Sequence, residues 1–187
     1  MLLLELLRRY YPFDEPEAQM QAQLSRFLEN ASTGTTDVFG RELAGAAPEW
    51  GHVTGSAWII NSDGSRTVLV HHAKLGKWVQ PGGHCDGQAD VLAVALREAQ
   101  EETGLTVTPV GGDIFDIDVH PIPEYWNTPE HWHFDVRFLL QADDDNAPQV
   151  SSESRAVRWV SLDEAAQLNN SQSITRMIDK TRQRFAS

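Results

Sequence analysis

Residues Gln80 to Leu105, QPGGHCDGQADVLAVALREAQEETGL, decide the fold of this chain. A glycine-rich loop leads into a segment whose apolar side chains recur every three or four positions, which predicts an amphipathic helix from about Asp90 to Thr103. Gly104 follows at the expected helix end. We expect one face of this helix to pack on a β-sheet. Its residues are Leu92, Ala95, Leu96, Ala99 and Thr103.

A second face of the same helix carries three glutamates, Glu98, Glu101 and Glu102. Carboxylates at these spacings are neighbours and repel each other by some tenths of a kcal/mol per pair, so a compensating cation is expected. Mg²⁺ prefers oxygen ligands and is typically shared between carboxylates and substrate phosphates. Acidic triplets are also common on solvated helices, and the triplet alone does not establish a metal site.

With its flanking residues, the segment resembles the Nudix box. In that box a glycine, five residues, a glutamate and seven residues precede the pattern R-E-U-x-E-E-x-G-U, where U is bulky and apolar. Here Gly83 opens the pattern, Arg97 and Glu98 fall in register, and Leu105 closes it. The resemblance covers about residues 50 to 170. The sequence GGHCDG and an N-terminal helical extension look like a bacterial Nudix subgroup.

The resemblance implies a hydrolase that uses metal-activated water to cut a diphosphate linkage between a nucleoside diphosphate and another group. Mg²⁺ is the implied cofactor, and Mn²⁺ can substitute for it. The implied metal ligands are Glu98, Glu101 and Glu102, with the carbonyl of Gly82 as a further one. Arg97 is expected to orient the glutamates through an ion pair.

One position departs from the box, because Ala89 stands where its first glutamate is expected. In the family that glutamate lies outside the metal-binding trio and supports the loop and helix. Asp90, near the predicted helix start, is expected to take its place. The catalytic base remains open between Glu98 of the box and Glu153 of a later loop.

Two other functions fit the pattern less well. A Nudix-fold regulatory module that senses a nucleotide without cutting it would account for Ala89, but such a module has little reason to keep the repelling glutamates and Arg97. An isomerase acting on a diphosphate would need a paired catalytic cysteine and acid. Cys85 lies beside the box with no evident base, so a small buried residue is the simpler interpretation.

Candidate substrate contacts come from histidines and aromatic residues. His84 is expected to touch phosphate, and Trp78 is expected to stack on a nucleobase, as Tyr125, Trp126 and Trp132 also could. His133 alternates with His131 and Asp135, which places the three on one strand face. A second alternating set comprises Asp116, Asp118 and His120. Either set could contact substrate or an extra metal, although an exposed sheet face has the same alternation, and packing is the alternative role for each tryptophan.

Composition restricts the partners. With 187 residues and a net charge of -12, the chain is expected to bind a small phosphate compound through cations and not a long nucleic acid. The single cysteine favours a reducing cytoplasm. No stretch approaches the ~20 apolar residues of a membrane span, and the run from Leu2 to Leu7 predicts a short amphipathic helix in place of a signal peptide. Oligomeric state stays open, a homodimer included.

The chain divides into residues 1–50, an N-terminal helical extension and linker, and residues 51–187, a Nudix hydrolase domain. The extension holds a helix from about Asp14 to Asn30 and a loop from Ala31 to Trp50. The predicted strands are Val53–Ile60, Thr67–His71, Leu105–Val110, Ile114–His120, His133–Gln141 and Ala156–Val160. Two helices close the chain, the first from Ser161. This order predicts an α/β (α+β) class, a Nudix-type α/β/α sandwich with a mixed β-sheet and an N-terminal helical extension.

Overall fold

A mixed seven-stranded sheet forms the centre of the computed structural model, which describes residues 3–31, 38–40, 51–124, 129–143, 146–152 and 154–186. The strand order is β3-β2-β1-β6-β5, with β4 paired to β1 and β7 paired to β2. The strands are β1 (Gly51–Ile60), β2 (Arg66–His72), β3 (Trp78–Val79), β4 (Gly82–His84), β5 (Thr108–Ile122), β6 (His131–Gln141) and β7 (Ser154–Ser161). Strands β1 and β6 run parallel, whereas the other pairs are antiparallel.

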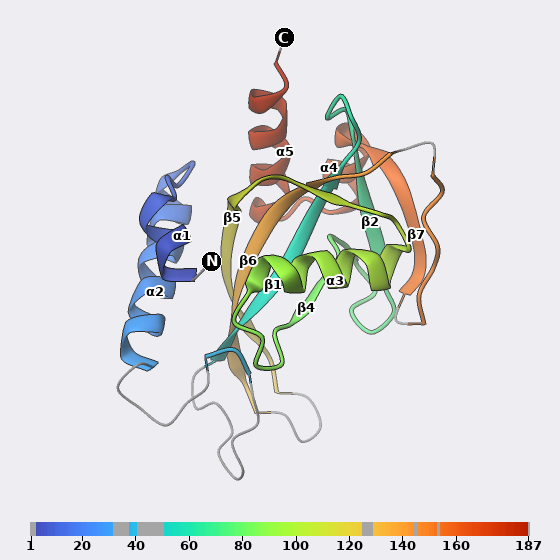
Figure 1. Cartoon of the computed structure of the whole chain (residues 1–187). Helices are drawn as coiled ribbons and strands as arrows, with labels where there is room; N and C mark the ends of the chain where they lie inside the picture. Colours follow the sequence, from blue (N-terminus) through green and yellow to red (C-terminus); the bar gives the residue numbers. More distant parts are fainter. Residues whose placement is uncertain are drawn as a thin grey trace.

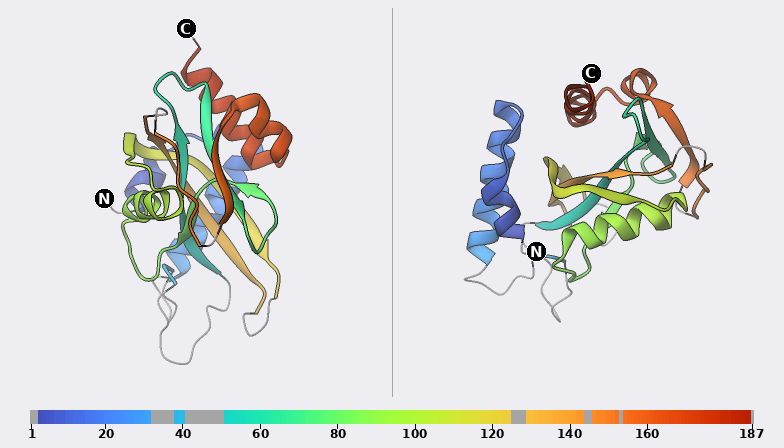
Figure 2. Two further views of the ribbon diagram at one scale, coloured as in Figure 1. Left: turned by 90° about the vertical axis from the view of Figure 1, so that its right-hand side faces the viewer. Right: turned by 45° about the horizontal axis from the view of Figure 1, so that its top comes forward.

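Helices cover both faces of this sheet (Figure 1). Helix α3 (Val91–Thr103) crosses one face, and α4 (Leu162–Leu168) and α5 (Gln172–Arg184) lie on the other, as the second view of Figure 2 shows. Helices α1 (Leu3–Arg9) and α2 (Glu15–Ala31) lie along the β5 edge. The predicted α/β/α class is therefore confirmed. None of the helices in the described part of the chain is long and apolar enough to cross a bilayer.

The helix ends follow the local signals in the sequence. The Asp90 carboxylate accepts the Ala93 N–H at 3.2 Å and caps α3, while Gly104 ends that helix at φ 68°. Ser161 Oγ accepts the Glu164 N–H at 3.1 Å, so the predicted cap of α4 is confirmed. These caps satisfy backbone groups that a helix leaves without internal partners.

Several details differ from the prediction, among them the short strands β3 and β4, which were not predicted. The strands expected at Leu105–Val110 and Ile114–His120 are one strand, β5, whose pairing with β6 shifts register between Pro109 and Asp116. The adjacent glycines 111 and 112 take φ of +96° and +83°, which glycine tolerates, and so the chain passes the irregularity without ending the strand.

Helix α3 is also rotated relative to its expected packing face. Val91 and Val94 are buried against the sheet, whereas Leu92 and Leu96 are only half-buried. Val94 lies against β1 at Gly55, where an added Cβ would come within 2.9 Å of Val94 Cγ1. Because α3 and β1 approach so closely, valines pack between them better than the larger leucines. Helical periodicity alone does not predict this distance.

A buried ionic network joins the N-terminal helices to the sheet and to α5. Asp116 of β5 accepts hydrogen bonds from Arg137 of β6 (3.1 Å) and from Arg176 (2.7 and 2.9 Å) and Lys180 (2.8 Å) of α5. Burial alone would raise the pKa of Asp116, but the hydrogen bond from Arg176 and the charges of Arg137 and Lys180 hold that pKa below its usual value. The carboxylate is therefore ionised in the core.

Glu17 of α2 is the second buried carboxylate of this network. Its oxygens accept the Ile117 N–H at 3.0 Å, the Phe13 N–H at 2.7 Å and Lys180 Nζ at 2.5 Å, and Tyr10 also donates its hydroxyl to Glu17. Glu17 is completely buried. The Glu17 side chain thus connects the segment between α1 and α2 with strand β5 and with helix α5.

Replacing Glu17 by alanine should destabilise the protein. The change leaves Lys180 and the Ile117 N–H buried without this acceptor, and we expect the free energy of unfolding to fall by about 3–5 kcal/mol in urea denaturation. The matched variant Glu15→Ala, at an exposed position of the same helix, should change it by less than about 0.5 kcal/mol. Equal effects of the two variants would contradict the anchoring role of Glu17.

Candidate metal and active site

The short strand β4 brings two glycines against the middle of the sheet. Gly82 pairs with Ser56 and Gly83 pairs with Gly55 of β1. An added Cβ would lie 2.0 Å from Ser56 Oγ at the first glycine and 2.6 Å from Glu98 Cδ at the second. Both contacts are shorter than van der Waals packing allows. At Gly82 the neighbours include the Ser56 Cα at 2.9 Å, so β1 and β4 approach this closely only with glycine there, whereas at Gly83 the neighbour is the flexible end of Glu98.

Glu98 of α3 rests on this glycine backbone. Its side chain is 15% exposed, and Arg97 donates to Glu98 Oε1 at 2.7 Å. The same guanidinium group donates to the backbone carbonyl of His84 at 2.9 Å. Arg97 therefore links the end of β4 to the carboxylate, which is the ion pair that the sequence predicted.

Glu102 lies one helical turn further and is 6% exposed. Its Oε2 accepts the Gly82 N–H at 3.0 Å, so α3 touches β4 through two carboxylates. Glu101 lies on the solvent side, with its side chain 64% exposed and its Oε2 3.9 Å from Arg97 Nε. The three glutamates thus share one helix but have three different environments.

These residues fit a hard divalent cation. The Glu98 carboxylate fills the space that a Cβ on Gly83 would occupy, and Glu102 is held beside it by the Gly82 amide. The three glutamates do not form a closed set, because the described residues contain one group of three ligand side chains within 4.8 Å of one another, and it consists of histidines. An open pair of carboxylates suits Mg²⁺, which keeps several waters and binds through one or two carboxylates and substrate phosphates.

Ala89, the position that departs from the box, is exposed in the loop before α3. Asp90 beside it uses Oδ1 to cap the helix at Ala93. The expectation that Asp90 replaces the missing glutamate remains a prediction, because capping is a role that many helix starts require by themselves.

Histidines from four strands, β1, β4, β5 and β6, gather beside Gly82 and Gly83. The parallel pairing of β1 and β6 sets His52 opposite His133, and the β5 to β6 pairing sets His120 opposite His133. Ring centroids of His52 lie 4.7 Å from His84, 5.0 Å from His131 and 4.7 Å from His133. The sequence indicated His131, His133, His84 and His120 but not His52, because only the parallel register brings its strand alongside.

Two members of this histidine cluster, His52 and His133, are held neutral. Burial and the nearby imidazoles together lower the pKa of His52 to about 4 and that of His133 to about 2. His120 Nδ1 lies 3.0 Å from Asp118 Oδ2. Burial would raise the pKa of Asp118, but the Arg137 charge and the His120 hydrogen bond lower it to about 2.

The other candidate residues take different positions. Trp78 stacks on His71, with ring centroids 5.1 Å apart, and Arg158 lies 4.9 Å from its ring centroid, so Trp78 packs against β2 and β7. Cys85 is 1% exposed, and burial raises the pKa of its thiol to about 12, which agrees with a packing role. Trp132 is 43% exposed. The candidates outside the described residues are Glu153, Tyr125 and Trp126.

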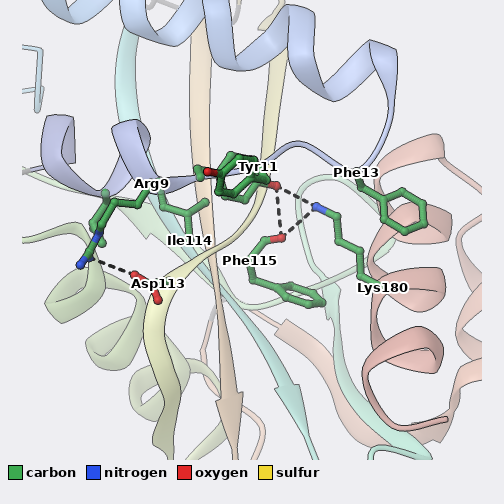
Figure 3. A pocket seen from close by; sticks show the side chains of 9 residues that line it. Arg9, Tyr11, Phe13, Asp113, Ile114, Phe115 and Lys180 are labelled. Atoms are coloured by element: carbon green, nitrogen blue, oxygen red, sulfur yellow. Dashed lines mark hydrogen bonds and ion pairs between the residues drawn. The ribbon is translucent and has the colours of Figure 1, made fainter.

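A separate pocket of about 290 Å³ lies between α1, β5 and α5 (Figure 3). Arg9 pairs with Asp113 at its rim at 3.0 Å, and Lys180 reaches the carbonyl of Phe115 at 2.8 Å. Lys180 also belongs to the buried network around Asp116. The pocket therefore belongs to the interface between the N-terminal helices and the sheet.

Comparisons with known proteins all point to one family. The NUDIX domain model matches residues 51–180. A CMP-5'-(N-acetyl-N-hydroxy-3-aminopropyl)phosphonate hydrolase of Streptomyces rubellomurinus is 30% identical over 161 residues, which cover 77% of this chain and 68% of the relative. An asymmetrical bis(5'-nucleosyl)-tetraphosphatase of Rattus norvegicus is 34% identical, but the match covers 53% of this chain and 62% of that protein.

Solved structures have the same fold at lower sequence identity. The MutT protein from Methanosarcina mazei superposes with a TM-score of 0.55 at 20% identity, covering 76% of this chain and 100% of that one. The C. elegans Ap4A hydrolase, in a binary complex, gives a TM-score of 0.54 at 18% identity, covering 72% of this chain and 97% of that one. At these identities the likeness shows the fold alone.

Replacing Gly83 by alanine should weaken the metal site with little effect on folding. The new Cβ displaces the flexible end of Glu98, and we expect Mn²⁺ affinity, measured by electron paramagnetic resonance, to fall about tenfold or more. The free energy of unfolding should change by no more than about 1 kcal/mol.

Gly76→Ala is the control for this variant. Gly76 has nothing within 4 Å of an added Cβ, so its replacement adds a methyl group away from α3. Its positive φ of 61°, which Gly83 does not share, makes the backbone cost of this variant the larger of the two, and its Mn²⁺ affinity should still stay unchanged. Unchanged Mn²⁺ affinity in Gly83→Ala would show that Glu98 does not hold the ion.

Proposed function

Because this chain belongs to the Nudix family, we propose that it is a Mg²⁺-dependent hydrolase that cuts a diphosphate linkage in a small nucleotide derivative. One observation carries the proposal. The carboxylates of Glu98 and Glu102 both lie against the Gly82–Gly83 backbone, where a metal-bound phosphate would meet strand β4. The exposed Glu101 completes the acidic face of the helix.

Each residue of this site has a distinct proposed task. Glu98 and Glu102 hold the cation, and the carbonyl of Gly82 and the carboxylate of Glu101 are further ligands. When bound, the ion neutralises phosphate oxygens and lowers the pKa of a water molecule. Arg97 keeps Glu98 in place through its 2.7 Å hydrogen bond and ties it to β4.

The catalytic base is proposed to be Glu98 or Glu153. Glu98 lies within the box and is partly shielded from solvent. The only support for Glu153 is its position in the sequence, shortly before Trp159. The variant Glu153→Gln separates the two, because a base contributes roughly 10²–10⁴ in rate and its amide cannot accept the proton.

The substrate is proposed to bind next to the histidine cluster. His84 is exposed, follows Gly83 directly and has its ring centroid 5.2 Å from that of His133. A phosphate group bound beside Gly82 and Gly83 would therefore lie close to the imidazole groups of this cluster. Trp78 remains the proposed base-stacking residue, although its ring already stacks on His71 and lies 4.9 Å from the Arg158 guanidinium.

Residues 51–187 are proposed to form the catalytic unit, with the first fifty residues as its N-terminal extension. The single cysteine supports a location in the cytoplasm, where thiols stay reduced. The net charge of -12 supports a small substrate over a long nucleic acid.

The proposed activity can be tested with nucleotide derivatives that the relatives' names suggest. Substrates would be a CMP phosphonate conjugate, a bis(5'-nucleosyl) tetraphosphate, dihydroneopterin triphosphate and ADP-ribose, each with Mg²⁺, Mn²⁺ or chelator. We expect metal-dependent release of phosphate-containing products from at least one. Glu98→Gln and Glu102→Gln should lower kcat/KM about 100-fold or more, because they remove proposed metal ligands.

Glu164→Gln is the matched control. Glu164 is a half-exposed glutamate of helix α4, and its Oε1 lies 2.9 Å from Arg158 Nη2 of strand β7. This variant should leave turnover unchanged. Tight nucleotide binding without turnover in the presence of either metal would overturn the hydrolase and favour a sensing module.

A further inference from the structure

Three imidazoles converge beside the glycine loop without help from any carboxylate. His52, His131 and His133 each offer one ring nitrogen, and these nitrogens all lie within 4.8 Å of one another. His52 and His131 are each 8% exposed. The three side chains come from two neighbouring strands, whose parallel pairing is continuous from Gly51 to Ile60, so the sheet fixes their spacing.

The orientation of His131 leaves a lone pair pointing at His133. His131 Nδ1 lies 2.8 Å from the carbonyl oxygen of Pro129, and since a carbonyl can only accept, that nitrogen carries the proton. In a neutral ring Nε2 is then unprotonated, and it lies 3.3 Å from His133 Nε2. A backbone carbonyl that fixes the tautomer is also the usual outer partner of a metal-binding histidine.

The spacing of these two nitrogens matches a tetrahedral metal site. Ligands bound at 2.0–2.1 Å with a tetrahedral angle between them lie about 3.3–3.4 Å apart. A hydrogen bond from His133 to His131 would have a similar length. That bond, however, leaves His52 Nε2 buried with no hydrogen-bond partner. An unpaired buried ring nitrogen costs about 1–3 kcal/mol, and a cation shared with His131 and His133 would remove that cost for His52.

We propose that His52, His131 and His133 bind a borderline transition-metal ion of the Zn²⁺ class, separate from the cation of the glutamate site. Imidazole nitrogens suit Zn²⁺, Co²⁺ and Ni²⁺, whereas Mg²⁺ prefers the oxygens on α3. Three protein ligands leave a fourth position open to water or to a phosphate oxygen of a substrate. The exposed His84 lies beside two of the three ligands, with its ring centroid 4.7 Å from that of His52 and 5.2 Å from that of His133.

The two sites are neighbours joined through one residue. The ring of His84 lies in the histidine cluster, while its carbonyl accepts a hydrogen bond from Arg97, the partner of Glu98. An anion spanning both would contact a hard cation at one end and a softer one at the other. Metal binding by the histidines does not depend on the hydrolase activity and can be measured without substrate.

Cobalt absorption spectroscopy tests the proposal on full-length protein without a histidine tag. After chelation and dialysis, an equimolar amount of Co²⁺ should give the intense visible bands of tetrahedral coordination, and Zn²⁺ should displace them and raise the Tm. His133→Asn and His52→Gln should weaken Co²⁺ binding at least about tenfold and abolish the Zn²⁺-induced rise in Tm. Circular dichroism establishes folding, and if His52→Gln does not fold, His133→Asn alone decides.

Two controls separate this site from others. His71→Asn removes a histidine that stacks on Trp78 outside the cluster, and it should keep the Co²⁺ spectrum. The double variant Glu98→Gln with Glu102→Gln should keep it as well. The proposal is overturned if the wild-type protein gives no tetrahedral bands, if the His133→Asn variant retains them, or if the glutamate double variant loses them.

Discussion

The ionised carboxylate of Asp116, buried among Arg137, Arg176 and Lys180, is the interaction on which the other parts of this structure depend. A charge in the core is tolerated only with opposite charges and hydrogen bonds at short range, and Asp116 receives both from β6 and α5. Glu17 shares Lys180 and brings in α2. The network therefore specifies which face of β5 meets α5, and it fixes the pairing of β5 with β6.

That pairing also determines which polar side chains share one face of the sheet. Side chains alternate along a strand, so the register that places Asp116 against Arg137 also sets Asp118 against Asp135 and His120 against His133. On the other side of β6, the parallel pairing with β1 continues the same polar row, because Thr54 and Ser56 donate hydroxyls to Asp135 at 3.0 and 2.8 Å. A slip of one residue would turn the whole row toward the apolar face that α3 covers.

The sequence predicted the parts of this fold that depend on local patterns. Helix α3 with its end at Gly104, and the three glutamates on it, follow from periodicity and helix-end chemistry. Strands β3 and β4 were missed because two or three residues carry no periodic signal, and His52 was missed because its neighbours come from a parallel pairing across eighty residues. The box implied that Glu98, Glu101 and Glu102 bind a metal ion, but not that Glu98 and Glu102 lie against the Gly82–Gly83 backbone. It could not show that Glu101 faces solvent, since all three share the same helical spacing.

The charge of the chain explains why metal ions are central to its chemistry. With a net charge of -12, the surface repels a phosphate substrate, and the cationic side chains near the site are already engaged: Arg97 by Glu98, and Arg137 by Asp116, Asp118 and Asp135. His52 and His133 are neutral and add no charge of their own. Positive charge for the phosphates of the proposed substrate would therefore come from bound cations, and both groups of potential ligands, carboxylates on α3 and imidazoles on β1 and β6, lie beside the same pair of glycines.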